Sequence, residues 1–391
     1  MVVKVSKPAL NLREKLSELF KPSGIAGEAM LRAETPQEQF NLIGAGRRNL
    51  IINGDQRIDQ RNDGSSITLN DWAAYATDRM RFGARPSTGT ATIQRVADAP
   101  EGFYYSAKIS RLTGSADSNN YYSLLTKIEG NDIAHSGVGT SSAQDITISF
   151  WVKSNLTGIW SVGLQNEAGG GDRRSYNTEY TINSASVWEY KTVTIPLLQD
   201  GVFYYDNRAC FQVNFDLGSG ASYTNTTLNQ WQAANIVASA NAVRFFETAG
   251  ATWQITGVQL ELGKVATPFE HRSYGEELAL CQRYYQKFFD ESGVNVQLQL
   301  IGLNSTTGHF VWWPPVQMRA RPTVGITTTT PYWESYPWNT PGTSLTISGI
   351  SNGHMGRSGG EIAVFGSFNP GLVRGTNYSM SAEALYWDTE L

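Results

Sequence analysis

Aromatic side chains are densest in the last third of this 391-residue sequence. Tyr332, Trp333, Tyr336 and Trp338 lie close together in a proline-rich stretch that we expect to form loops. The apolar face of a sugar stacks on flat aromatic rings, while its hydroxyls bond to polar side chains at the rim of a site. The pattern predicts that these four residues contact a glycan. The alternative is that they fill an interface between identical subunits or pack within their own module.

One pair of acids could cleave sugars. Glu167 and Asp172 flank a run of three glycines. Catalysis by such a pair requires two carboxyl groups of different acidity that converge in a cleft. A glycine-rich loop commonly carries solvated acids, however, and Arg173 and Arg174 stand next to this pair. We therefore predict no catalytic residue and no enzymatic activity.

Metal and cofactor sites are not predicted. Histidines occur at positions 135, 271, 309 and 354, and none has a second ligand at metal spacing. Asp55, Asp59 and Asp63 offer oxygen atoms for calcium but lack the fixed loop of a known calcium cage. Cys210 and Cys281 are the only cysteines, and we expect two buried thiols instead of a disulfide framework.

The composition excludes two kinds of partner. Only 17% of the residues are charged and the net charge is -4, so no basic field is available for nucleic acid or an anionic membrane. The longest apolar runs are much shorter than the roughly 20 residues of a membrane-spanning helix. The first residues, Met1 to Lys4, do not open a signal peptide. We expect a protein that is made without Sec export and does not insert into membranes.

Residues 1–46 have a helical pattern. Leu12, Leu16 and Leu19 form a short apolar stripe, and a second helix is predicted to carry Phe40 and Leu42. Helices this short are not stable alone, so the stripes need a partner. The segment is interpreted as a docking peptide that uses these five residues to contact other proteins or further copies of the chain.

Residues 47–272 show the period of extended strands. Ile146, Ile148 and Phe150 share one face of a predicted strand, and Thr147 and Ser149 share the other. The same alternation returns at 193–195, 211–215 and 258–262. No amphipathic helix separates these strands, so the pattern predicts an antiparallel, jelly-roll-like β-sandwich in a mainly β protein.

Residues 273–391 are predicted to hold one connecting helix and a second, C-terminal β module. Ser273 and Glu276 have the spacing of a helix-capping box, and Leu278, Cys281, Tyr285 and Phe288 would share one helical face. Short apolar runs follow at 296–301, 309–313, 323–326, 362–365 and 385–387. Prolines between them limit the module to short or edge strands.

Four groups of motifs resemble one family of proteins. They are Arg48-Asn-Leu-Ile-Ile-Asn-Gly-Asp55 with Arg57, Ile58, Gln60 and Asp78-Arg79-Met80; residues 253–263 with 266–272; residues 274–285; and residues 314–323. In this order they are similar to the opening strand, closing strand, helix and C-terminal module of tailed-bacteriophage tail-fibre and related virion proteins, whose sandwich is like a carbohydrate-binding module. Met80 departs from the pattern, since similar proteins more often have tryptophan there.

The resemblance implies a virion protein, made in the host cytoplasm, that is structural or contacts a receptor and is often trimeric. On this basis the chain is expected to be a tail fibre or adhesin that is anchored through residues 1–46 to tail, neck or head proteins. Its β domains would then contact a host-surface polysaccharide. Two alternatives remain open: a capsid- or collar-bound spike, and a glycan depolymerase, which no convincing carboxylate pair supports.

Overall fold

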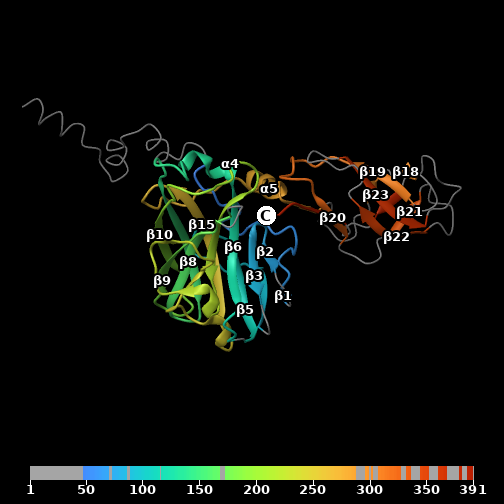
Figure 1. Ribbon diagram of the computed structural model, residues 1–391. Coiled ribbons are helices and arrows are strands. Elements are labelled where there is room, and N and C mark those ends of the chain that lie inside the picture. The colour runs from blue at the N-terminus through green and yellow to red at the C-terminus, as the bar shows by residue number, and fades with distance from the viewer. Residues whose placement is uncertain are drawn as a thin grey trace, which may run out of the picture. The chain divides into compact units, whose positions relative to one another are not determined.

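Two antiparallel β-sheets dominate the computed structural model of the protein (Figure 1). The structure describes residues 47–287 apart from 70–72, 86–88, 115 and 168–171. Beyond them it describes 296–298, 301–302, 307–326, 332–335, 344–351, 360–367, 378–380 and 385–390. The predicted mainly β fold and its antiparallel sandwich are confirmed. The predicted N-terminal helices, with Leu12, Leu16, Leu19, Phe40 and Leu42, lie outside the described residues.

The first sheet contains six strands. They are β1 (Ile67–Leu69), β4 (Thr90–Val96), β5 (Ser106–Thr113), β7 (Asp145–Ser154), β10 (Glu189–Pro196) and β15 (Thr252–Leu262). Their order across the sheet is β1-β4-β5-β15-β7-β10, and every neighbouring pair is antiparallel. Strand β15, the last of these six in the sequence, therefore lies in the middle of the sheet between β5 and β7. The sheet cannot be completed before residue 262 is in place.

The second sheet contains seven strands. They are β2 (Ala73–Thr77), β3 (Met80–Arg85), β6 (Tyr121–Glu129), β8 (Gly158–Asn166), β9 (Ser175–Ile182), β11 (Ala209–Asp216) and β13 (Trp231–Gln232). Their order is β13-β9-β8-β11-β6-β3-β2, again antiparallel throughout. The connections cross repeatedly from one sheet to the other, as in a jelly roll. Short helical turns in these connections are α4 (Gly130–Ile133) and the 3-10 turns Ala134–Ser136, Ala221–Tyr223 and Phe245–Glu247.

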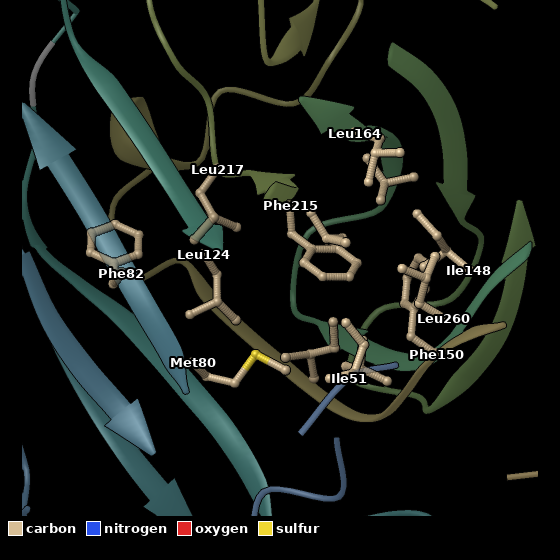
Figure 2. Packing of buried hydrophobic residues seen from close by; sticks show 14 of the residues in the cluster. Ile51, Met80, Phe82, Leu124, Ile148, Phe150, Leu164, Phe215, Leu217 and Leu260 are labelled. Carbon is tan, nitrogen blue, oxygen red and sulfur yellow. The ribbon is translucent and has the colours of Figure 1, made fainter. Parts of the chain in front are cut away.

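The core lies between the two sheets. Figure 2 shows side chains of both sheets directed toward one another, among them Phe150 of the first sheet and Phe215 of the second. Their rings meet edge to face with centroids 5.0 Å apart. Burying a large apolar side chain contributes about 1.5–3 kcal/mol. Apolar residues alternate with mostly polar ones along β7 and β11, and this alternation fixes which face of each strand points inward.

The opening and closing motifs of the sandwich meet in the structure. The side chain of the buried Asn49 donates from Nδ2 to the Val258 carbonyl (3.1 Å), and its Oδ1 accepts from the backbone amide of Leu260 (3.1 Å). Gly54 passes so close to the same strand that a β-carbon there would lie 2.1 Å from the Val258 oxygen. Arg272 donates to the carbonyl of Ile51 (3.2 Å). These contacts give a physical reason for the residue types of the resemblance.

The connecting helix α5 (Tyr274–Gln282) is shorter than predicted. Ser273 caps it as expected, since its hydroxyl accepts from the Glu276 amide (3.3 Å). The prediction that Tyr285 continues the helical face is wrong. Tyr285 begins strand β16 (Tyr285–Lys287), which pairs with β25 (Leu385–Asp388). This strand from the far end of the chain satisfies the backbone groups that a longer helix would have used.

The described residues of the C-terminal part include further strands, as predicted. Strand β20 (Thr323–Ile326) joins β16 and β25 in a sheet of order β16-β25-β20. A further seven-stranded sheet comprises β17 (Val296–Leu298), β18 (Ile301–Gly302), β19 (Thr307–Trp312), β21 (Tyr332–Ser335), β22 (Ser344–Ser351), β23 (Gly360–Ser367) and β24 (Tyr378–Met380). Its order is β17-β24-β21-β22-β23-β19-β18. No helix in the described part of the chain is both long and apolar enough to span a membrane.

Candidate functional site

A cleft of about 230 Å³ opens on the outer face of the second sheet. Residues 220–239 contain the edge strand β13, and on either side of it they cross part of this face, where they form the short parallel pair β12 (Thr224–Asn225) and β14 (Ala238–Ser239). The crossing segment is held by hydrogen bonds from the Ser239 amide to the Ser161 hydroxyl (2.7 Å) and from the Asn229 amide to the Asn177 carbonyl (2.9 Å). It contacts β8 and β9 and leaves a hollow bordered by β3, β6 and β11. We call this hollow the sheet-face cleft.

The floor of the sheet-face cleft is polar. Gln212 on β11 donates to the Asn214 side-chain oxygen (2.5 Å), and the Tyr121 hydroxyl of β6 donates to the same oxygen (3.2 Å). Gln165 on β8 donates to Asn235 of the crossing segment (2.7 Å). Burial raises the pKa of Tyr121 to about 12, so its hydroxyl remains a donor at neutral pH. Amides and a phenol together offer both donors and acceptors to a ligand.

Aromatic rings form one wall of the cleft. The Tyr121 ring meets the ring of Tyr223 edge to face, with centroids 5.4 Å apart. Gly83 lies beside them on β3, where a β-carbon would approach the Tyr121 ring to 3.2 Å. The missing side chain leaves this ring uncovered on the β3 side. Rings beside amides are the combination that holds a sugar by its apolar face and its hydroxyls.

The rim of the cleft is charged and internally paired. Glu167 lies 3.5 Å from the Lys127 ammonium and 3.3 Å from the Arg173 guanidinium. Burial lowers the pKa of Lys127. Asp172 instead pairs with Arg174 (3.0 Å), whose hydrogen bond lowers the pKa of that carboxyl. Each acid therefore pairs with a neighbouring arginine, Glu167 with Arg173 and Asp172 with Arg174.

The predicted glycan-binding residues fall only in part on described positions. Tyr332 and Trp333 belong to strand β21, so the expectation of a loop is wrong for these two. Tyr336 and Trp338 lie outside the described residues. Ligand contact by the four residues stays a prediction.

The sheet-face cleft was missed by sequence reasoning, although part of its pattern was visible. Polar Gln212 and Asn214 alternate with the apolar core residues of β11, which marks them as facing away from the core. Residues 220–239 follow no period. Nothing in their sequence indicates that they lie over β8 and β9.

Metal ligands do not gather in the described part of the chain. No group of three or more His, Cys, Asp or Glu side chains there could hold an ion. Asp59 uses both carboxylate oxygens in its own turn, since they accept from the amides of Asn62 (3.2 Å) and Gly64 (2.8 Å). Cys210 and Cys281 are both buried free thiols, as predicted.

Comparison with known proteins gives matches only among solved structures, since no family model and no curated protein matches the sequence. A tailspike enzymatically active domain of bacteriophage CBA120 is 12% identical over 55% of this chain and 21% of its own, with a TM-score of 0.28. A xylan-binding CBM22 domain of Paenibacillus barcinonensis is 13% identical over 46% of this chain and 91% of its own (TM-score 0.28).

A family 11 carbohydrate-binding module of Clostridium thermocellum, in complex with a mixed-linked tetrasaccharide, is 12% identical over 53% of this chain and 98% of its own (TM-score 0.26). The chain spans about a fifth of the tailspike domain that it matches. The fold assignment rests on the strand pairing described above, and these likenesses carry no argument about ligand or activity.

Proposed function

We propose that the chain is a non-enzymatic structural component of a tailed-bacteriophage virion, a tail fibre or adhesin that contacts glycans on the host surface. The observation that carries the glycan part is the sheet-face cleft, where the rings of Tyr121 and Tyr223 adjoin the amides of Gln165 and Gln212. The virion part rests on the resemblance of the ordered sequence motifs.

Binding in the cleft would use its polar floor and its ring wall together. A sugar hydroxyl can hydrogen-bond to the side-chain amide of Asn235, while an apolar ring face packs on Tyr223. The amides are already oriented by the hydrogen bonds among them, so little side-chain entropy is lost when a ligand binds.

The paired rim supports binding over cleavage. Glu167 is held by two cations, Lys127 and Arg173, and Asp172 is paired separately with Arg174. A sugar-cleaving pair requires one carboxyl that stays protonated and one that is ionised. Glu167 and Asp172 each lie beside an arginine instead, and the hydrogen bond from Arg174 lowers the pKa of Asp172.

The experiment is a binding assay of purified protein on host cells, in competition with phage adsorption. Tyr223→Ala removes a ring from the cleft and is expected to weaken binding about tenfold, the effect of losing roughly 1.4 kcal/mol. The matched control is Tyr190→Ala, since Tyr190 lies on β10 of the other sheet and also makes one ring contact, with Trp151 at 5.4 Å. Equal binding by both variants would rule out the cleft, and release of reducing ends from host polysaccharide would show a depolymerase.

The proposed assembly is a homotrimer anchored by residues 1–46. Light scattering at micromolar concentration is expected to give three times the mass of one chain, 43.0 kDa, and a monomer would remove this part of the proposal. A truncated chain that starts at Arg47 is expected to fold but not to join the particle. Incorporation of the truncated chain would argue against N-terminal anchoring.

A further inference from the structure

We infer that the sandwich has a second, separate binding site for a neutral saccharide unit, in a hollow where its opening and closing segments meet. The hollow has a volume of about 490 Å³ and is lined, among others, by Asp55, Arg57, Arg95, Tyr104 and Tyr274. It shares no lining residue with the sheet-face cleft. We call it the tyrosine hollow.

The walls of the tyrosine hollow are tied together by arginine side chains. Arg57 donates to the carbonyl of Arg272 (2.8 Å), and Arg95 of β4 donates to the carbonyl of Arg57 (2.7 Å). Three segments distant in sequence, at 55–63, 95–105 and 271–274, are thereby fixed around one space. Such a hollow is formed before any ligand arrives, as is usual for small-molecule sites.

Two exposed tyrosine rings line the hollow. The relative exposure is 71% for Tyr104 and 60% for Tyr274. The Tyr104 ring is supported by Tyr105, with ring centroids 4.7 Å apart, and the Arg95 guanidinium lies 4.4 Å from the centroid of the Tyr105 ring. Large aromatic faces that stay exposed beside one cavity offer a stacking surface for the apolar face of a sugar.

A buried carboxylate in the same hollow lacks a hydrogen-bond partner on one oxygen. Asp55 has only 8% exposure, and one of its oxygens lies 2.6 Å from the Arg57 Nε atom. The other oxygen is buried and accepts no hydrogen bond from the described residues. Buried polar atoms are normally satisfied, so this oxygen calls for a donor such as a ligand hydroxyl.

The charges around the hollow are balanced, which selects the class of ligand. Arg57 pairs with Asp55, and Arg95 lies 3.5 Å from Asp63 and 3.8 Å from Asp59. Arg272 is occupied by the carboxylates of Glu270 and Glu277 (3.2 and 3.3 Å). Each of the three arginines that line the hollow thus already pairs with a carboxylate, which disfavours a phosphate or an acidic sugar as the ligand. Hydroxyl groups, which both donate and accept, fit these paired charges best.

The test needs a readout at the hollow itself. Protein labelled with 3-fluorotyrosine is titrated with glucose, galactose, mannose and N-acetylglucosamine, and with glucuronic acid and glucose 6-phosphate as charged counterparts. Tyr104→Phe and Tyr274→Phe assign the two ¹⁹F resonances. We expect both resonances to shift with at least one neutral sugar. Asp55→Asn should weaken the binding of that sugar about tenfold, which is the effect of losing one good hydrogen bond.

Controls separate this site from the sheet-face cleft. Tyr223→Ala is expected to leave the ¹⁹F titration of Tyr104 and Tyr274 unchanged, because Tyr223 lines only the sheet-face cleft. Three outcomes would each overturn the inference. They are shifts that persist undiminished in Asp55→Asn, an absence of shifts with all four neutral sugars, and tighter binding of the charged sugars than of the neutral ones. None of these outcomes bears on whether Tyr223→Ala weakens binding to cells, so the two sites stand or fall separately.

Discussion

Glu390 forms an ion pair with Arg79, 311 positions earlier in the chain. Both side chains are almost fully buried, with exposures of 3% for Arg79 and 7% for Glu390. The Arg79 guanidinium also lies 3.6 Å from the centroid of the Tyr284 ring and donates to the Lys127 carbonyl (2.6 Å). The last residues of the sequence therefore complete the environment of a charge that belongs to the opening motif of the sandwich.

Removal of the Glu390 carboxylate should destabilise the protein strongly. Glu390→Gln leaves the buried Arg79 without its counter-charge, and breaking one partner of a buried pair costs about 3–5 kcal/mol. Urea denaturation of the two proteins measures the difference. Glu247→Gln is the matched control, because it breaks the exposed pair between Arg244 and Glu247 (3.0 Å), which should cost less than about 1 kcal/mol. Equal effects of the two variants would contradict the buried-pair argument.

Asn53 should be among the most sensitive polar residues of the sandwich. Its side chain donates to the carbonyls of Ile58 and Asp78 (both 2.8 Å) and accepts from the Ile58 amide (2.9 Å). Its φ of 59° also lies in the left-handed region that asparagine tolerates better than alanine. Asn53→Ala is expected to cost at least about 3 kcal/mol in the free energy of unfolding, since several buried groups lose their partners.

The control for Asn53 is an exposed asparagine with similar bonding. Asn155 donates to the Gly250 carbonyl (2.9 Å) and accepts from the Thr252 amide (2.8 Å) at the surface, where water can replace both bonds. Asn155→Ala should cost no more than about 1 kcal/mol. If chemical denaturation ranks the two substitutions the other way, burial does not set the cost.

Stability should fall as the pH rises from about 4 to about 7. Burial raises the pKa of Asp78 and of Asp216 from 3.8 to about 6. Between these values the folded state holds protons that the unfolded state has lost, so this contribution is fully present below pH 3.8 and is lost as the pH passes 6. For Asp216 it amounts to about 2–3 kcal/mol.

The substitution Asp216→Asn isolates the contribution of Asp216 to the pH dependence of stability. Asp216 accepts from the amides of Gly218 (2.9 Å) and Ser219 (3.0 Å), and an asparagine can accept similar bonds without titrating. The dependence of the unfolding free energy on pH between 4 and 7 should be flatter in the variant. An unchanged slope would show that Asp216 titrates normally in the folded protein.

Neither cysteine should react in the folded protein. Cys210 and Cys281 are both buried. Burial raises the pKa of the Cys210 thiol to about 12, and it also raises the pKa of the Cys281 thiol. The thiolate is the reactive form, so a thiol reagent at neutral pH should modify neither residue until denaturant is added. Mass spectrometry counts the modified thiols, and labelling of either one under native conditions would contradict the buried placement.

Four strands of the sandwich, β7, β10, β11 and β15, could be predicted from the alternation of apolar and polar residues. Period two alone places Ile148, Phe215 and Leu260 on the apolar faces of their strands, and all three are buried in the core. The helix end could not be predicted. Tyr285 fits a helical face by spacing, but a strand from residues 385–388 pairs with it, and Arg61 lies 3.7 Å from the centroid of its ring. Contacts between residues so distant in sequence override local spacing.

The candidate sites show the same limit. Polar Gln212 and Asn214 could be assigned to an outward face, yet the cleft exists only because residues 220–239 return over that face. In the tyrosine hollow, Asp55, Tyr104 and Tyr274 come from three separate segments. No periodicity within one segment indicates that such residues converge.

The segment that crosses the second sheet has a consequence for how the protein can change over evolutionary time. Residues 220–239 touch the outer face of β8 and β9, but they also include strand β13, which pairs with β9, and Trp231, which packs against the core. Insertions and exchanges in surface segments are tolerated far better than changes in packed strands. Diversification of the exposed positions in this one stretch would therefore remodel the sheet-face cleft on an otherwise unaltered scaffold.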